Sequence, residues 1–180
     1  STKEFIAAVP GEKYHVLKTD GNYNNEIGVP LTLFRIREEH EAAVIEMGIN
    51  HFGEMHRLSR MAAPDIVVMT NIGDCHLEAL GSREGVLKAK SEIFDFMSED
   101  GTIIVNGDDE LLAGIKEINK KTPVTFGRNK NNACYVFGVC SKGLFGTEAK
   151  LHIPSGDFKV KIPLPGEHMV YNALAAAAVG

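Results

Sequence analysis

Short apolar runs alternate along the chain with longer segments whose apolar residues recur at helical spacing. The runs expected as strands are residues 42–47, 65–70, 102–106 and 124–127. The segments expected as helices between them are residues 55–61, 82–97 and 109–119. Strands that alternate with helices are typical of parallel βαβ units, in which the crossover helices cover the sheet. This part of the chain therefore predicts a mostly parallel sheet flanked by helices.

Both ends of the chain add further elements. Residues 2–9 predict a helix that Pro10 and Gly11 end. The elements expected next are a strand at 14–18, a polar loop at 19–25 and a helix at 31–37. Near the C-terminal end, extended runs separated by turn residues predict a small antiparallel β meander, and an alanine-rich helix follows it. These last elements are residues 134–139, 143–153, 157–162 and 171–179. The predicted fold class is α/β, a mostly parallel sheet flanked by helices with this meander attached.

Composition and charge narrow the class of protein. With 180 residues, 44% of them hydrophobic, the chain is long enough for one domain with a sizeable core. The net charge of -5 argues against nucleic acid as the main partner, because phosphate backbones select basic surfaces. Cys75, Cys134 and Cys140 are an odd number without Cys-x-x-Cys spacing, which predicts free thiols. Neither a long apolar stretch nor a signal-peptide pattern is present, so we expect a cytoplasmic protein without membrane insertion.

Polar side chains follow three of the predicted strands. Glu46 ends one strand, residues 71–76 follow another, and residues 106–109 follow a third. In open α/β sheets, ligands bind beyond the carboxyl ends of the strands. Each signal alone also has a structural explanation, since a carboxylate in this place is commonly a helix cap or a surface charge. A lone histidine such as His76 is commonly structural too. The positions alone therefore leave both interpretations open.

Several motifs in a fixed order make the pattern more specific. They are Glu46-Met47-Gly48, Gly53-Glu54, the segment 70–82, Ala89-Lys90-x-Glu92-Ile93, Asn106-x-Asp108-Asp109 and the segment 165–176. Together they resemble the central domain of the Mur ligases over nearly the whole chain, which implies a P-loop NTPase-like fold. The asparagine-rich segment 19–30 ends in Ile27-Gly28-Val29-Pro30. It resembles the branch of the family that adds D-alanyl-D-alanine.

The resemblance implies a metal site and a modified lysine. Glu46 and His76 would bind a magnesium ion, and Lys90 would carry a carbamate made from carbon dioxide. Magnesium prefers oxygen ligands and usually keeps several waters, so the carboxylate suits it better than the histidine. Carbamylation requires a neutral amine and turns the lysine cation into an anion with two oxygens. Lys88, two residues earlier, points to another face of the helix and is expected to be a solvated surface group.

The same resemblance assigns nucleotide and substrate contacts. Asn172 would face the adenine, with His168 and Asn106 as further nucleotide-binding candidates. Capping or loop bracing is the alternative role for these two, and Asp108 and Asp109 could cap the next helix. The residues assigned to the substrate end of the site are Asn22, Asn24, Asn25, Thr70 and Asn71. The three loop asparagines have turn formation as their alternative role.

The implied reaction is amide-bond formation driven by ATP. ATP would phosphorylate the carboxylate of UDP-N-acetylmuramoyl-tripeptide, and the amine of D-alanyl-D-alanine would then displace phosphate. Positioning and charge neutralisation by magnesium supply much of such catalysis. Folylpolyglutamate synthase, another Mur ligase, and a non-catalytic module that retains the fold remain alternatives. A P-loop GTPase-like switch protein does not explain the Lys90 motif.

The chain also departs from the family pattern. The family's Gly-x-x-Gly-Lys-Thr phosphate loop would precede residue 1, because Ser1-Thr2-Lys3 resembles the residues just after it. We therefore expect one central domain, residues 1–180, that is truncated at both ends and inactive without the N- and C-terminal domains of the same protein. Its expected parts are a parallel α/β part at 1–130, the meander at 131–165 and the start of the nucleotide-side helix at 166–180. Met169 stands where the family often has asparagine, which leaves the assignment unchanged.

Overall fold

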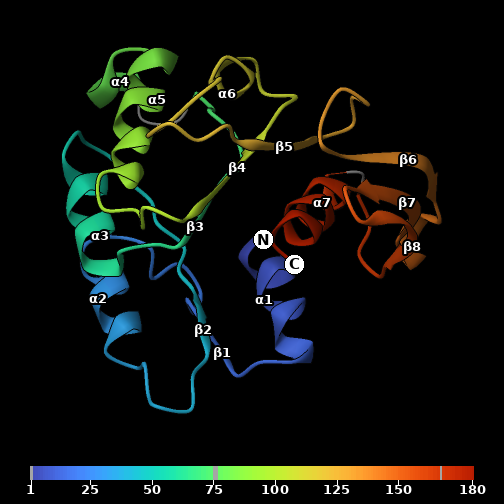
Figure 1. The fold of residues 1–180 in the computed structure, drawn as a ribbon, viewed down its shortest axis with the longest axis horizontal. Coiled ribbons are helices and arrows are strands. Elements are labelled where there is room, and N and C mark those ends of the chain that lie inside the picture. Colours follow the sequence, from blue (N-terminus) through green and yellow to red (C-terminus); the bar gives the residue numbers. More distant parts are fainter. Residues whose placement is uncertain (1, 75–76, 167) are drawn as a thin grey trace.

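The computed structural model describes residues 2–74, 77–166 and 168–180, and its strands form two sheets (Figure 1). The smaller sheet pairs β1 (Val16–Lys18) and β2 (Ala42–Val44) in parallel. The larger sheet has six strands in chain order: β3 (Ile66–Met69), β4 (Thr102–Asn106), β5 (Val124–Gly127), β6 (Cys134–Ser141), β7 (Thr147–Ile153) and β8 (Gly156–Ile162). Strands β3 to β6 pair in parallel, whereas β6, β7 and β8 are antiparallel. The predicted α/β class with a C-terminal meander is confirmed.

The helices lie between and beside these strands. The α-helices are α1 (Thr2–Ala8), α2 (Gly28–Leu33), α3 (Glu54–Ala62), α4 (Leu77–Leu80), α5 (Arg83–Ser91), α6 (Glu110–Ala113) and α7 (Met169–Val179). The 3₁₀ helices are η1 (Pro10–Glu12), η2 (Glu92–Phe94) and η3 (Gly143–Phe145). Within the described ranges, no helix has both the length and the hydrophobicity that crossing a lipid bilayer requires.

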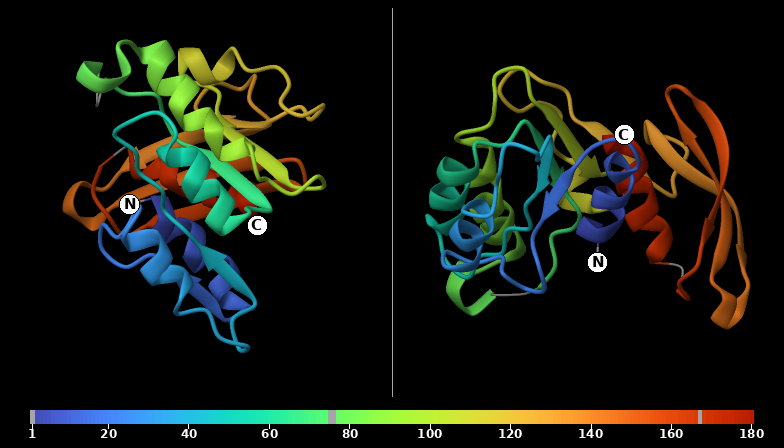
Figure 2. Two further views of the ribbon diagram at one scale, coloured as in Figure 1. Left: turned by 90° about the vertical axis from the view of Figure 1, so that its left-hand side faces the viewer. Right: turned by 90° about the horizontal axis from the view of Figure 1, so that it is seen from below.

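The centre of strand β4 is apolar because both faces of the strand are buried there. Ile103 and Val105 point into a core formed with α3 and α5, and Ile104 points into a second core formed with α7. This alternation follows from the two-residue period of a strand. Continuous apolar runs are therefore typical of parallel strands covered on both faces. Figure 2 shows α1 and α7 between the parallel strands and the meander, which curls around α7.

Several predicted elements differ in their bounds from those observed. The helix predicted at 31–37 begins earlier, at Gly28, because the side chain of Asn25 accepts the first free N–H groups of α2. The long helix predicted at 82–97 ends as α-helix at Ser91 and continues as η2. The strand predicted at 42–47 is shorter and only partly buried, and in the described part of the chain it pairs with β1 alone.

The prediction of a helix at 109–119 was wrong over most of that range. Helix α6 ends at Ala113, and Ile118 forms an isolated bridge with Lys121. The two residues between them have left-handed backbone conformations, with φ of 50° at Asn119 and 64° at Lys120. These residues turn the chain back toward β5, and a right-handed helix could not continue through them.

Candidate functional site

Glu46 lies just beyond the end of β2 and beside the residue that follows β1. Its backbone N–H donates to the buried hydroxyl of Thr19 at 2.9 Å. Asn24 Nδ2 donates to Glu46 Oε1 at 3.1 Å, and the Lys3 ammonium lies 3.1 Å from Oε2. Gly48 permits the approach of the loop, because a Cβ at this position would lie 3.1 Å from the amide nitrogen of Asn24. The structure thus brings together two predicted site residues, Glu46 and Asn24. It also places Lys3, which was not predicted as a site residue, beside Glu46.

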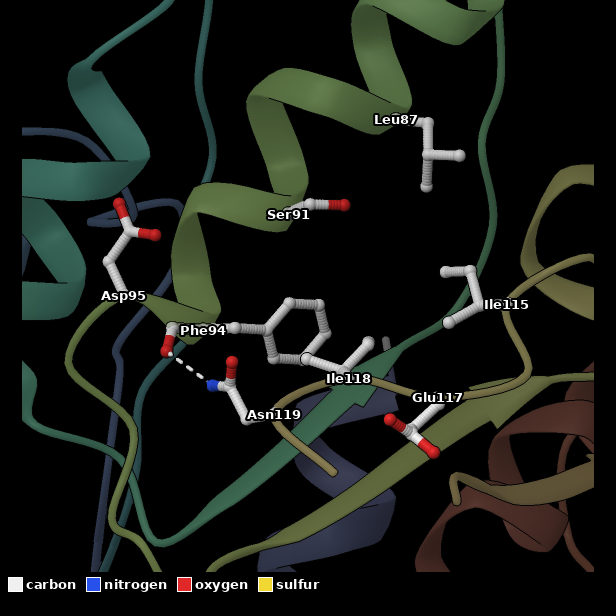
Figure 3. Close-up of a pocket in the computed structure, with 8 residues that line it drawn as sticks. All are labelled: Leu87, Ser91, Phe94, Asp95, Ile115, Glu117, Ile118 and Asn119. Carbon is white, nitrogen blue, oxygen red and sulfur yellow. Dashed lines mark hydrogen bonds between the residues drawn. The ribbon is translucent and has the colours of Figure 1, made fainter. Parts of the chain in front are cut away.

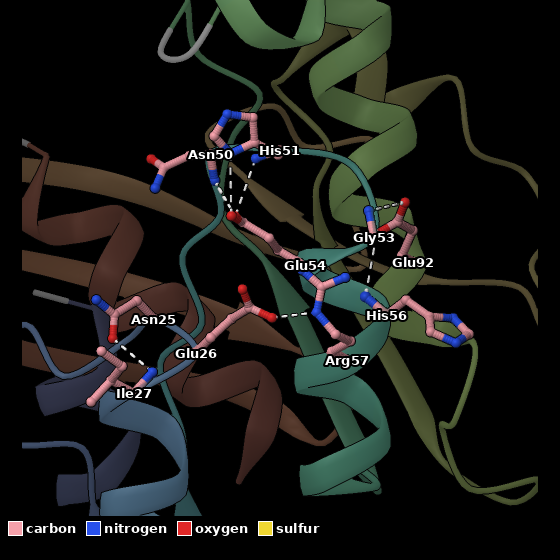
Figure 4. Close-up of polar contacts among 10 residues, drawn as sticks. All are labelled: Asn25, Glu26, Ile27, Asn50, His51, Gly53, Glu54, His56, Arg57 and Glu92. Carbon is pink, nitrogen blue, oxygen red and sulfur yellow. Dashed lines mark hydrogen bonds and ion pairs between the residues drawn. The ribbon is translucent and has the colours of Figure 1, made fainter.

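The other two loop asparagines lie differently. Asn25 Oδ1 accepts the backbone N–H of Ile27 at 3.1 Å and that of Gly28 at 2.9 Å. Figure 4 shows the first of these bonds at the start of α2. Asn22 is exposed, and its carbonyl accepts the N–H of Asn24 at 2.7 Å. Asn25 therefore makes the turn-forming contacts that were given as its alternative role.

Lys90 lies at the end of α5 and reaches the loop after β3. Its ammonium donates to the carbonyl oxygen of Asn71 at 2.9 Å, and its side chain is partly buried. Lys88 is exposed instead, with Nζ 6.0 Å from the ring centroid of Phe52. The two lysines thus occupy different environments on one helix. The predicted histidine ligand, His76, lies outside the described residues.

The loops after β3 and β4 brace one another. Asn106 Nδ2 donates to the Thr70 carbonyl at 2.9 Å, and its Oδ1 accepts the N–H of Asp108 at 3.0 Å. Asp109 caps the start of α6, and its second carboxylate oxygen accepts the N–H of Ile72 at 2.7 Å. The hydroxyl of Thr70 donates to Oδ1 of the next residue, Asn71, at 3.3 Å. Asn106 therefore makes loop-bracing contacts and Asp109 makes helix-capping contacts. These are the roles given above as alternatives for the two residues.

The two candidates at the start of α7 contact other parts of the chain. Asn172 Oδ1 accepts the hydroxyl of Thr2 at 2.7 Å, and its Nδ2 lies 3.5 Å from Sδ of Met169. The first contact ties α7 to α1. His168 precedes the helix, and a Cβ on Gly166 would lie 2.6 Å from its ring. Asn172 would have to exchange these internal partners for an adenine.

Glu46 could supply one oxygen ligand to a magnesium ion. Its side chain is 33% exposed, so one side of the carboxylate faces solvent. Magnesium in proteins commonly takes one or two carboxylates and completes its octahedron with water and substrate phosphates. Among residues 2–74, 77–166 and 168–180, no group of three or more His, Cys, Asp and Glu side chains could hold a metal.

Comparison with known proteins places this arrangement in a family. A family model described as the Mur ligase middle domain matches residues 1–180. The chain belongs to the Mur ligase family. It is 43% identical over 180 residues to UDP-N-acetylmuramoyl-tripeptide--D-alanyl-D-alanine ligase of Bacillus subtilis, covering 100% of the chain and 38% of the relative. The Escherichia coli ligase of the same name is 40% identical, with coverage of 99% and 40%.

Solved Mur ligase structures agree with the sequence match. Crystal structure I of MurF from Acinetobacter baumannii superposes with a TM-score of 0.90 at 35% identity, covering 98% of this chain and 39% of that one. MurF ligase from Thermotoga maritima in complex with ADP gives a TM-score of 0.86 at 28% identity, covering 99% and 41%. The chain thus spans about two fifths of the length of the Mur ligases it matches.

A pocket elsewhere on this Mur ligase domain contains none of the predicted site residues. It has a volume of about 360 Å³ and lies between α5, η2 and the segment after α6 (Figure 3). Its lining residues are Leu87, Ser91, Phe94, Asp95, Ile115, Glu117, Ile118 and Asn119. The chemistry of the family motifs is therefore better sought at the carboxyl ends of the strands than in this pocket.

Glu92, quoted above only as part of the lysine motif, fixes the start of α3. Its carboxylate accepts the N–H of Gly53 at 2.9 and 3.0 Å and that of His56 at 3.2 Å (Figure 4). Gly53 has a φ of 82°, which favours glycine at the turn into the helix. Helix α3 is thus capped by a side chain from η2, a long-range contact that a local capping pattern in the sequence does not reveal.

We expect Glu92→Ala to lower the free energy of unfolding by about 1–2 kcal/mol, because it leaves helix N–H groups without an acceptor. Urea unfolding followed by circular dichroism would measure this. Glu99, an exposed glutamate in the following turn, supplies the control. Its alanine variant should change stability by no more than about 0.5 kcal/mol. Equal losses in the two variants would contradict the capping role.

Asp108 joins three parts of the chain. Its carboxylate accepts hydrogen bonds from the backbone N–H groups of Arg128 and Asn129, the Asn132 amide and the Tyr171 hydroxyl. Burial alone would raise the pKa of Asp108, but these hydrogen bonds hold it below its ordinary value. Burial and the bond to Asp108 raise the pKa of Tyr171 to about 12. The carboxylate therefore ties the loop before α6 to the β5–β6 loop and to α7.

We expect Asp108→Asn to lower stability at neutral pH by about 1 kcal/mol, since the carboxylate is the better acceptor. A lowered folded pKa gives stabilisation that is fully present above the unfolded value of about 3.9 and is lost as the pH falls through the folded value. The difference in urea midpoint between the two proteins should therefore shrink at strongly acidic pH. Asp100→Asn, at an exposed turn, is the control. A difference that stays constant with pH would contradict the assignment.

Proposed function

We propose that this chain is the ATP-handling middle part of a ligase that joins D-alanyl-D-alanine to UDP-N-acetylmuramoyl-tripeptide. The observation that carries the proposal is the match over the whole chain to relatives of that name, at 43% and 40% identity. The contact of Asn24 with Glu46 supports it. It joins the asparagine-rich segment typical of this branch to the carboxylate proposed as a metal ligand.

The proposed reaction has two steps. A carboxylate oxygen of the tripeptide attacks the γ-phosphorus of ATP, and ADP leaves. The amine of the dipeptide then attacks the acyl carbon, phosphate leaves, and the nitrogen loses a proton. Magnesium, when bound, neutralises charge on the phosphate oxygens. The remaining contribution of the protein is to position the reactants, which is where much of the rate of phosphoryl transfer originates.

The residues have separate positioning roles in this proposal. Glu46 and His76 would hold the metal, and Lys90 would add two oxygens as a carbamate. Thr19 and Asn24 keep Glu46 in place through the hydrogen bonds at its backbone N–H and at Oε1.

The remaining candidates line the two ends of the site. The nucleotide end is formed by Asn172, His168 and Asn106. The substrate end is formed by Asn22, Asn24, Asn25, Thr70 and Asn71. The loops that carry Thr70 and Asn106 are hydrogen-bonded to each other.

The proposal includes further parts of the same protein. A phosphate loop would cradle the ATP phosphates with backbone N–H groups. Flanking N- and C-terminal domains would hold the UDP moiety and the incoming dipeptide, and the enzyme would act in the cytoplasm, where ATP is available. The relatives, of which the chain spans about two fifths, have the length for such domains.

The test is phosphate release by the full-length protein that contains this sequence, supplied with ATP, magnesium, UDP-N-acetylmuramoyl-tripeptide and D-alanyl-D-alanine. Release that requires both the tripeptide and the dipeptide is the expected result. Activity with glutamate and a folate instead would reassign the protein to folylpolyglutamate synthases. A lack of release with either pair of substrates would favour a non-catalytic module that retains the fold.

A further inference from the structure

Lys3 is a buried charge that the proposed reaction does not use. Only 7% of its side chain is exposed, although it lies near the start of α1. Lysine is rarely buried to this extent unless it is paired. Its ammonium lies 3.1 Å from Glu46 Oε2 and donates to the carbonyl oxygen of Gly21. These two acceptors explain how the charge is tolerated.

Glu46 is therefore already neutralised on one side. Its Oε2 faces Lys3 and its Oε1 accepts from Asn24, yet a third of the side chain remains exposed. A divalent cation that approaches from solvent meets a carboxylate already paired with an ammonium. The two cations repel each other and compete for the same oxygen lone pairs.

We propose that Lys3 is a positioning residue that holds Glu46 in the absence of metal and gives up Oε2 when a divalent cation binds. The inference rests on the proposed function, which assigns Glu46 to magnesium. Gly21 makes the exchange possible, because its carbonyl remains an acceptor for Lys3 after the carboxylate turns to the metal. The long flexible stem of lysine allows the ammonium to move by the small distance required.

A second lysine–glutamate pair that also includes a residue of α1 supplies a matched control. Lys18 of β1 pairs with Glu4 of α1, and both side chains are more than 40% exposed. Exposed pairs of this kind contribute little to stability. The pair at Lys18 therefore resembles that at Lys3 in chemistry and in its use of a residue of α1, but it differs in burial and does not involve Glu46.

The experiment measures Mn²⁺ binding to the full-length protein that contains this sequence, by electron paramagnetic resonance of the free ion. Lys3→Gln removes the competing charge while its amide can still donate to Gly21. We expect this variant to bind Mn²⁺ about tenfold more tightly, the order expected when one unit charge leaves a partly exposed site. Lys3→Arg keeps the charge and should bind as the wild type does, and so should Lys18→Gln. Unchanged or weaker binding by Lys3→Gln would overturn the inference.

A measurement on the wild type covers the case in which Lys3→Gln does not fold. The Nζ nuclear magnetic resonance signal of Lys3 should shift when Mg²⁺ is added, while that of Lys18 stays in place. A Lys3 signal that does not respond would also overturn the inference.

Glu46→Gln separates failure of this inference from failure of the proposed metal site. Mn²⁺ binding that persists in this variant would remove Glu46 from the metal site and overturn both. If Mn²⁺ binding depends on Glu46 but is not strengthened by Lys3→Gln, only the role proposed for Lys3 is contradicted.

Discussion

Ligation by the full-length enzyme is expected to fall by at least about 10²–10³-fold when Lys90 is replaced by alanine, the order found when one preorganised electrostatic group is removed from an active site. In the proposed function, Lys90 would carry a carbamate that supplies negative charge and two oxygen ligands at the metal site. Its partly buried side chain already reaches the site loop through the Asn71 carbonyl, 2.9 Å away. Alanine removes both the carbamate and this contact. Initial rates of phosphate release at saturating substrates would measure the loss.

Two further variants distinguish the carbamate from a simple cation. Lys90→Arg keeps a positive charge and a donor for Asn71 but cannot form a carbamate, so it should be as inactive as Lys90→Ala. Lys88→Ala should leave activity nearly unchanged, because Lys88 is exposed and lies over Phe52. Full activity of Lys90→Arg, or equal losses at the two lysines, would rule out the carbamate assignment.

Replacing Glu46 with glutamine should raise the magnesium concentration needed for half-maximal activity by about tenfold or more, the order found when groups that support a metal site are removed. The change keeps the shape of the side chain and removes the charge that attracts the cation. It also leaves Lys3 without its carboxylate partner. Magnesium titrations at fixed ATP would measure the shift.

Glu54 supplies the control for this effect. Its carboxylate accepts the N–H groups of Asn50 at 2.6 Å and His51 at 3.1 Å, in the loop that follows Glu46 (Figure 4). Although burial opposes it, these bonds hold the pKa of Glu54 below its ordinary value. Glu54→Gln should therefore lower stability but leave the magnesium requirement unchanged. An unchanged titration for Glu46→Gln would remove Glu46 from the metal site.

Local patterns in the sequence predicted most elements but not all of their ends. Strand β4 was predicted correctly, because five successive residues with a continuous apolar centre have few other stable arrangements. The helix predicted at 109–119 was wrong beyond Ala113, although its apolar spacing continued past that residue, and the chain then adopts left-handed conformations at Asn119 and Lys120. Periodicity reports which residues can share a face, but it does not report backbone handedness.

The candidate site was predictable to the extent that motifs name its residues. Glu46, Asn24 and Lys90 were each identified from the sequence, and the structure places Asn24 on Glu46. Contacts made by Lys3 and Glu92 were missed, although both residues stand within quoted motifs. A motif gives residue types and spacing, and it contains no information about which backbone group a side chain reaches.

The sequence by itself determined the α/β class, the C-terminal meander and the positions of polar residues after the strands, since these depend on apolar periodicity and on turn residues within a few positions. Only the tertiary structure decided that Lys3 neutralises Glu46, which lies 43 positions away in the sequence. The same holds for the capping of α3 by Glu92, whose partner Gly53 lies 39 positions away. It also decided that Asp108 holds α7 through Tyr171. Such pairs are brought together by crossover connections between layers, and the packing of the two cores fixes their geometry. No local propensity specifies which distant partner a buried charge will find.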